Sequence, residues 1–129
     1  MTAAIRDERS AEFFDALADG KLFIRRCLPH GHLSSPDVMF CAECHSRDLE
    51  WTRADGEGTV VSWTAIHGRP DESGATSVSA YVGLVELVEG PWLLARLRVA
   101  DVADLHIGAR AGFEVLATQG EPIYAFRIG

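Results

Sequence analysis

Three cysteines and the histidines near them are the residues of this sequence best suited to chemistry. Cys27 and His30 form one pair with two residues between them, and Cys41 and Cys44 form a second. Such a pair turns the chain sharply enough to direct both ligands at one ion, and two pairs complete a tetrahedral zinc site. We therefore predict a structural zinc bound by these four residues. Because protein fills all four positions, none remains for a catalytic water.

The fourth ligand stays open at this stage, because His32 and His45 could also reach the ion. His30 leads because its spacing from Cys27 mirrors the C-x-x-C pair. An odd number of cysteines disfavours a disulfide framework. Residues 1–10 show no apolar secretory segment, which predicts a cytoplasmic protein with reduced thiols.

Two rival interpretations use the same cysteines. Cys41 to His45 matches the C-x-x-C-H haem attachment sequence, but covalent haem attachment normally follows export. Met39, the only methionine beyond the initiator, is also too close in sequence to be the opposite axial ligand. A thioredoxin-like pair would require a βαβ context, whereas loops and strands flank this pair. Zinc remains the hypothesis.

No catalytic constellation is recognisable in the sequence. It contains no G-x-S-x-G, phosphate loop or acid pair at a known spacing, so the isolated chain is predicted to be inactive. Two weaker candidate substrate sites remain: Arg25 and Arg26, which could face phosphate, and His67 with Arg69. The simpler interpretations are a charged strand edge and a surface loop.

The elements that must position these residues follow from periodicity. Apolar residues at helical spacing predict a helix over residues 10–19, with Ser10 as N-cap and Gly20 ending it. A short strand, Lys21 to Arg26, leads to the first cysteine. Residues 27–50 have no periodicity and cannot build an apolar core, so a metal is expected to hold them.

The rest of the chain reads as strands, which makes the protein mainly β. Residues 100–108 should form the connection after the third strand. Five strands at this spacing suggest a closed barrel of the OB-fold type, since closure removes exposed strand edges. The five expected strands are Gly58–His67, Val78–Leu87, Pro91–Val99, Arg110–Ala117 and Ile123–Arg127.

An exposed apolar surface is expected on the helix and the metal-bound segment. Phe13 and Phe14 point about 100° apart on a helix, so a small core cannot bury both. Leu28, Leu33 and Met39 lie in a segment held by metal rather than by packing. These five residues are predicted to bind a partner protein.

Charge bears on the main alternative, a zinc-ribbon and OB-fold module that binds single-stranded nucleic acid. Trp51, Trp63 and Trp92 could stack on bases. However, tryptophans in small barrels are usually core residues, and the net charge of −7 opposes binding to phosphate backbones. We therefore expect no nucleic-acid partner. The longest apolar runs are also too short to cross a membrane.

Taken in order, these features resemble a family of small acyl-CoA-associated proteins, long catalogued as a domain of unknown function. In this family an N-terminal helix and a rubredoxin-like zinc ribbon precede an OB-fold. The resemblance implies boundaries at 1–20, 21–55 and 56–129. His30 stands where the family's common ribbon has a second cysteine. The motifs that carry the resemblance are Gly20-Lys21-Leu22, the two ligand pairs, Gly56 to Ser62, Val85 to Gly90 and Ile107-Gly108.

The resemblance further implies a partner. Members of the family look like companions of thiolase-superfamily enzymes, including thiolases, acyltransferases and steroid side-chain aldolases. The partner is expected to hold the catalytic groups. The companion is expected to scaffold the complex and to help enclose the CoA arm of an acyl-CoA substrate.

Overall fold

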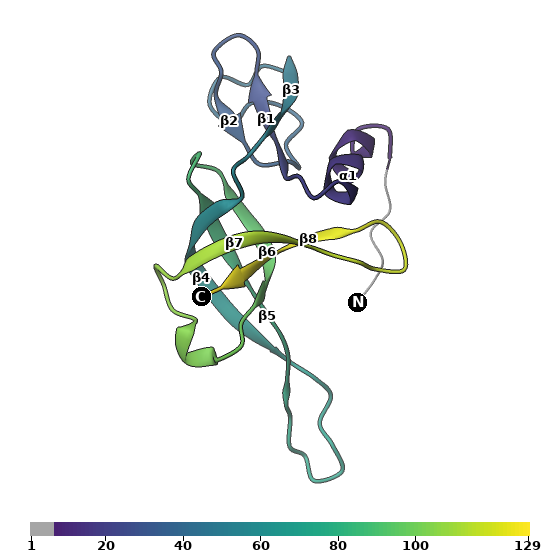
Figure 1. Ribbon diagram of the computed structural model, residues 1–129, viewed down its shortest axis with the longest axis vertical. Coiled ribbons are helices and arrows are strands. Elements are labelled where there is room, and N and C mark those ends of the chain that lie inside the picture. The colour runs from purple at the N-terminus through teal and green to yellow at the C-terminus, as the bar shows by residue number, and fades with distance from the viewer. Residues whose placement is uncertain (1–6) are drawn as a thin grey trace.

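The computed structural model of this protein describes residues 7–129. A helix, a small three-stranded sheet and a five-stranded closed barrel follow one another along the chain (Figure 1). This confirms the predicted fold class, which is mainly β with one N-terminal helix. Within residues 7–129, no helix combines the length and apolar character needed to cross a bilayer.

Helix α1 (Ala11–Ala18) packs its apolar face inward and ends at a glycine, as predicted. Phe13 and Leu17 are buried. Gly20 has a φ of 77° and lets the Lys21 backbone N–H donate to the carbonyl oxygen of Ala16. Ser10 differs from expectation, because its side chain caps no helical N–H; its hydroxyl donates to the Asp7 carboxylate.

The small sheet consists of β1 (Phe23–Cys27), β2 (Leu33–Ser34) and β3 (Leu49–Arg53), in the order β2-β1-β3 with antiparallel pairing. Its strands are short, and most of residues 28–48 is loop or turn. The sheet joins the barrel through apolar side chains. Leu22, Ile24 and Ala54 belong to the same buried cluster as the barrel core.

The barrel contains the five predicted strands. They follow the order β4-β5-β6-β8-β7, and β7 pairs with β4 to close the barrel. Only β6 and β8 are parallel. The 3-10 helix η1 (Val102–Asp104) lies in the predicted connection. The strand bounds are β4 (Glu57–His67), β5 (Val78–Leu87), β6 (Trp92–Arg98), β7 (Arg110–Leu116) and β8 (Ile123–Ile128).

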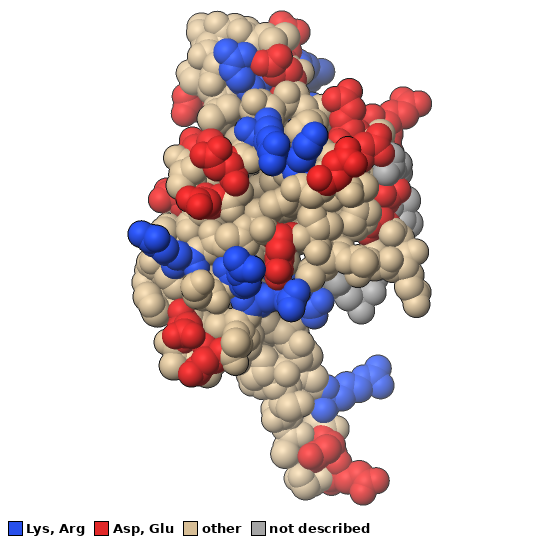
Figure 2. All heavy atoms as spheres, viewed as in Figure 1, with Lys and Arg blue, Asp and Glu red and all other residues tan. Residues whose placement is uncertain are grey.

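Strands β4 and β5 continue beyond the barrel as a two-stranded arm, residues 66–80 (Figure 1). Their pairing runs to His67 and Val78, whereas β6 pairs with β5 only from Tyr81 onward. Asp71 organises the tip, since its carboxylate accepts from the backbone N–H groups of Ser73 and Ala75. The stem of the arm is uncharged, and charged side chains appear only near the tip (Figure 2).

Candidate functional site

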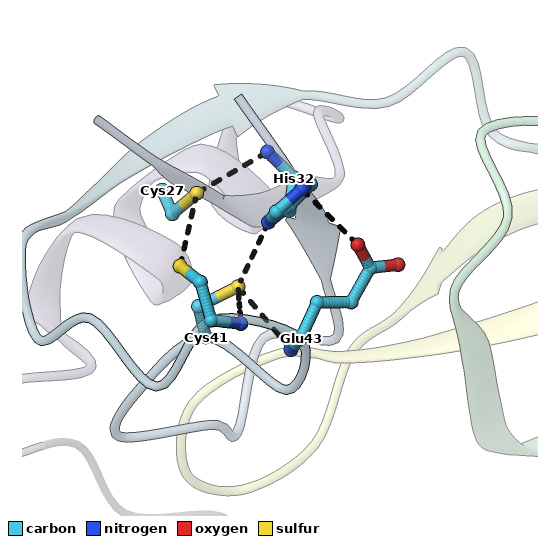
Figure 3. Close-up of polar contacts among 5 residues, drawn as sticks. Cys27, His32, Cys41 and Glu43 are labelled. Carbon is cyan, nitrogen blue, oxygen red and sulfur yellow. Dashed lines mark hydrogen bonds and ion pairs between the residues drawn. The ribbon is translucent and has the colours of Figure 1, made fainter. Parts of the chain in front are cut away.

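Three cysteines and one histidine converge between the ribbon loops. The sulfurs of Cys27, Cys41 and Cys44 and a ring nitrogen of His32 all lie within 4.8 Å of one another. Cys27 and Cys41 are fully buried. The side chains of Cys27, His32 and Cys41 turn toward a common centre from β1, from the residue before β2 and from the loop before β3 (Figure 3).

The spacing of these donor atoms fits a tetrahedral metal site. The Cys27 and Cys44 sulfurs are 3.9 Å apart, and His32 Nδ1 lies 3.5 Å from the Cys41 sulfur. Tetrahedral zinc with Zn–S near ~2.3 Å and Zn–N near ~2.0 Å would separate these pairs by about 3.8 Å and about 3.5 Å. The donor set and its geometry therefore suit a closed four-ligand site.

The structure brings His32, rather than the predicted His30, to the three cysteines. The chain turns after Cys27, where the Gly31 backbone N–H donates to the Cys27 carbonyl oxygen. It then returns beside β1, so that the Cys27 N–H donates to the His32 carbonyl oxygen. His30 lies on the exposed outside of this turn. The two turns are closed by equivalent hydrogen bonds, because the His45 N–H donates to the Cys41 carbonyl oxygen as the Gly31 N–H donates to that of Cys27, so spacing alone could not distinguish His30 from His32.

His45, the other alternative, is also outside the cluster. Its φ of 61° makes it the only residue other than glycine with a positive φ in the part described. Its backbone N–H donates to the Cys41 carbonyl oxygen, which closes the C-x-x-C turn. The ring packs edge-on against Phe40. His45 thus shapes the turn and binds nothing in the cluster.

Backbone N–H groups favour the thiolate form of Cys41. Its sulfur accepts from the N–H groups of Cys44 at 3.5 Å and Glu43 at 3.4 Å. These hydrogen bonds, with a further contribution from His32, lower the pKa of Cys41 to about 6. Thiolates are the metal-binding form of cysteine, so the turn prepares this ligand before any ion arrives.

A carboxylate contacts the outer nitrogen of the candidate histidine ligand. Glu43 Oε2 lies 3.2 Å from His32 Nε2, on the side of the ring opposite Nδ1 (Figure 3). Glu43 itself is one of the two residues between Cys41 and Cys44.

The four predicted substrate-contact residues do not form one site. Arg25 and Arg26 lie on β1, whereas His67 ends β4 on the arm and Arg69 follows it, at the opposite end of the molecule (Figure 1). Arg26 is paired with Glu50. Arg25 places its guanidinium 3.5 Å from the centre of the Trp51 ring. Of the four, Arg25 alone lines a surface hollow, which it shares with Arg9 and Arg47.

The five predicted partner-binding residues also do not form one exposed surface. Phe13 is buried and stacks on Trp51, so only Phe14 of the adjacent pair is partly exposed. Leu33 is partly buried against the core. Met39 is 64% exposed and Leu28 is 55% exposed, but only Met39 lines a hollow with Phe14.

Two adjoining hollows run along the surface beside α1. The first, of about 710 Å³, lies between α1, the ribbon loops and the barrel; the second, of about 860 Å³, continues toward the arm. Phe13, Phe14, Leu94 and Tyr124 line both, so we treat them as one apolar trough. Its other apolar residues include Met39, Leu84, Trp92, Val82 and Ile66.

The barrel residues that line this trough were not predicted from the sequence. Strands of a small barrel normally alternate, and Val85 and Leu93 face each other in the core. Their neighbours Leu84 and Leu94 also pair, on the outer face, where polar residues are usual. The unbroken run Trp92-Leu93-Leu94-Ala95 was the available signal. Trp63 and Trp92 are likewise on the surface, 38% and 51% exposed, which corrects the expectation that they are core residues.

Comparison with known proteins gives consistent matches. Residues 51–113 match the family of ChsH2 C-terminal OB-fold domains. A DUF35 domain-containing scaffold protein of Pyrococcus furiosus is 35% identical over 80 residues, which are 61% of this chain and 57% of that protein. The 3-oxo-4,17-pregnadiene-20-carboxyl-CoA hydratase alpha subunit of Mycobacterium tuberculosis is 36% identical over 77% of this chain, but only 31% of its own length is covered.

Solved structures agree over almost the whole chain. The Ltp2-ChsH2(DUF35) aldolase matches with a TM-score of 0.77 and 29% identity, covering 99% of this chain and 98% of that one. A DUF35-family protein from Sulfolobus solfataricus shares the fold, with a TM-score of 0.66, 20% identity and coverage of 95% and 86%. The matched residues span just over half of the Pyrococcus protein and less than a third of the hydratase subunit.

Proposed function

We propose that this chain, which belongs to the DUF35 family and carries a C-terminal OB-fold of the ChsH2 type, is a non-catalytic companion subunit. Its partner would be a thiolase-like enzyme, such as a thiolase, acyltransferase or side-chain aldolase, that acts on acyl-CoA. The relatives are consistent with this role, because they include a scaffold protein, a CoA-ester hydratase subunit and an aldolase. A cytoplasmic location suits it, since the cluster requires reduced thiols.

The observation that carries this proposal is the uncovered apolar trough. Leu94 is 67% exposed, Met39 64% and Trp92 51%, and all three line one continuous depression. Contiguous apolar surface of this kind marks protein interfaces. The trough, rather than the helix and ribbon alone, is therefore the proposed docking face.

Charge indicates what the partner presents there. The charged residues lining the trough are four arginines and two aspartates, although the chain as a whole is acidic. The arginines are Arg9, Arg25, Arg47 and Arg96. Electrostatic complementarity then favours a partner segment with apolar and acidic side chains.

Docking is tested by changing exposed leucine to aspartate. Leu94→Asp should reduce co-purification with a thiolase-superfamily subunit, identified by mass spectrometry from the native host, by about tenfold or more. Ile107→Asp is the matched control, because Ile107 is 74% exposed and lies outside both hollows. Equal co-purification of both variants would contradict the proposed face. Salt-sensitive retention of nucleic acid would favour the alternative module instead.

The companion is also proposed to be inactive alone. Within residues 7–129, the only cluster of metal-type donors is the four-ligand set, whose donor atoms all face one centre. Such a set leaves no open position for substrate. Turnover of acyl-CoA esters should appear only when the partner is added, and robust thiolysis, hydration or aldol cleavage by the purified chain would contradict this assignment.

Contact with the CoA arm is proposed at the ribbon end of the trough. The Arg25 guanidinium carbon lies 3.5 Å from the centre of the Trp51 ring, and Trp51 stacks on Phe13, so an aromatic layer supports the positive charge. Arg9 and Arg47 line the same hollow and could approach phosphate groups. In the assembled complex, Arg25→Ala should raise the KM for acyl-CoA and should reduce co-purification much less than Leu94→Asp does. Arg69→Ala, at the distant arm tip, should leave the KM unchanged.

Zinc is the metal we propose for the cluster. Three thiolates and one imidazole match its ligand preference, and the proposed role is structural. His32→Ala should lower the zinc content of protein purified without added metal, whereas His30→Ala should retain about one zinc per chain. Equal loss in both variants would show that the ligand set is misassigned.

A further inference from the structure

We propose that Glu43 positions His32 for metal binding, by accepting the Nε2–H of the ring so that Nδ1 faces the ion. This inference rests on the proposed zinc site. It follows from two contacts of one imidazole: Nδ1 lies 3.5 Å from the Cys41 sulfur, and Nε2 lies 3.2 Å from Glu43 Oε2.

The chemistry of the ring makes these contacts complementary. A neutral imidazole has one N–H donor and one nitrogen with a free lone pair. An ionised carboxylate only accepts hydrogen bonds, so Glu43 selects the tautomer with the proton on Nε2. The lone pair is then on Nδ1, the nitrogen that faces the cysteines. A carboxylate behind a metal-binding histidine is a recurring way to fix its orientation.

The place of Glu43 in the chain couples the two half-sites. It lies between Cys41 and Cys44, and its backbone N–H donates to the Cys41 sulfur at 3.4 Å. Its side chain reaches across to His32, which comes from the other half-site beside Cys27. The turn that prepares one ligand therefore also orients another.

Orientation matters here because a second imidazole is close. The ring centres of His30 and His32 are 5.3 Å apart. If His32 swung out, the neighbouring imidazole of His30 could replace it as a ligand. The contact with Glu43 favours a single ligand set among these possibilities.

The expected effect is moderate because the pair is partly exposed. The Glu43 side chain is 69% exposed and that of His32 is 33% exposed, so solvent screens their attraction. We expect Glu43→Ala to weaken zinc binding by about tenfold, the lower end of what such outer contacts contribute. Glu43→Gln should retain most of the affinity, since its amide oxygen can accept the same hydrogen bond.

The experiment uses the full zinc-loaded chain. Zinc affinity is measured by competition with a chromogenic chelator for the wild type, both Glu43 variants and Glu50→Gln. The last is a matched acid-to-amide control in the same ribbon, where Glu50 pairs with Arg26. Wild type, Glu50→Gln and Glu43→Gln are expected to have similar zinc affinities, and Glu43→Ala is expected to bind zinc more weakly. Wild-type affinity in Glu43→Ala would overturn the proposal.

A second measurement does not depend on any variant folding. Nitrogen-15 NMR of the wild-type ring distinguishes a metal-bound Nδ1 with a protonated Nε2 from the reverse arrangement. Finding Nε2 bound to zinc would overturn the role of Glu43 even if His32 is a ligand. By contrast, zinc retained in His32→Ala would reject the ligand set itself, so the two failures are distinguishable.

Discussion

Tyr124 is the residue through which α1, β6 and β8 meet beneath the trough. Its ring packs edge-on against Phe13 with ring centres 6.0 Å apart, and its hydroxyl donates to the Leu94 carbonyl oxygen at 3.0 Å. Burial, with a smaller contribution from Asp37, raises the pKa of Tyr124 to about 12. The floor of the proposed docking face therefore contains a half-buried phenol.

This residue predicts a distinct alkaline titration. The pKa is raised above the unfolded value of about 10, so the contribution of Tyr124 to stability is fully present below that pH. It is lost as the pH rises from there through about 12. Phenolate absorbance should show a transition near the upper value that is missing in Tyr124→Phe. Superimposable titrations of the two proteins would contradict the desolvation of this hydroxyl.

At the scale of elements, the close contact of β4 and β5 depends on glycine. A Cβ atom added to Gly83 would lie 2.3 Å from the Ser62 carbonyl oxygen and 3.0 Å from Leu97 Cδ1. The first of these is backbone, which cannot move aside without disturbing the strand pairing. Gly83 also lies opposite Trp63, near the root of the arm.

Gly83→Ala should therefore lower the free energy of unfolding by about 1–3 kcal/mol, the usual cost of overpacking. Gly112→Ala is the matched control, because a Cβ at Gly112 on β7 would meet nothing within 4 Å. That variant should be neutral or more stable by about 0.4–1 kcal/mol, since alanine restricts the unfolded chain. Urea denaturation of both proteins measures the difference. Equal stabilities would show that β4 and β5 are farther apart than described.

At the scale of the whole molecule, two parts of the chain have different sources of stability, and they overlap at the base of the small sheet. The ribbon loops are held at the Cys/His cluster, whereas Leu22 and Ile24 share the buried cluster that contains Val85 and Phe126 of the barrel. The base of the ribbon is thus part of the barrel core. We therefore expect the loops of residues 28–48 to depend most on the proposed metal, although Leu33 also packs against the core.

Metal removal should act locally for this reason. Chelation, or Cys44→Ala, should expose backbone amides in residues 28–48 to rapid hydrogen exchange while β5, β6 and β8 stay protected. β1 and β3 should keep partial protection, because their apolar side chains remain packed. Loss of protection over the whole chain in one step would show instead that the cluster and the barrel unfold as one unit.

The sequence by itself determined the elements and the kind of chemistry. Helix and strand periods, the glycine after α1 and the turns between strands depend on local contacts, so the five strands, their barrel and the clustering of the three cysteines could be predicted. Tertiary structure decided which groups meet. Spacing favoured His30, but the turn at Gly31 and the pairing beside β1 bring His32 to the cysteines. The trough likewise arises where α1, the ribbon and β6 approach one another, a contact between distant segments that no local pattern specifies.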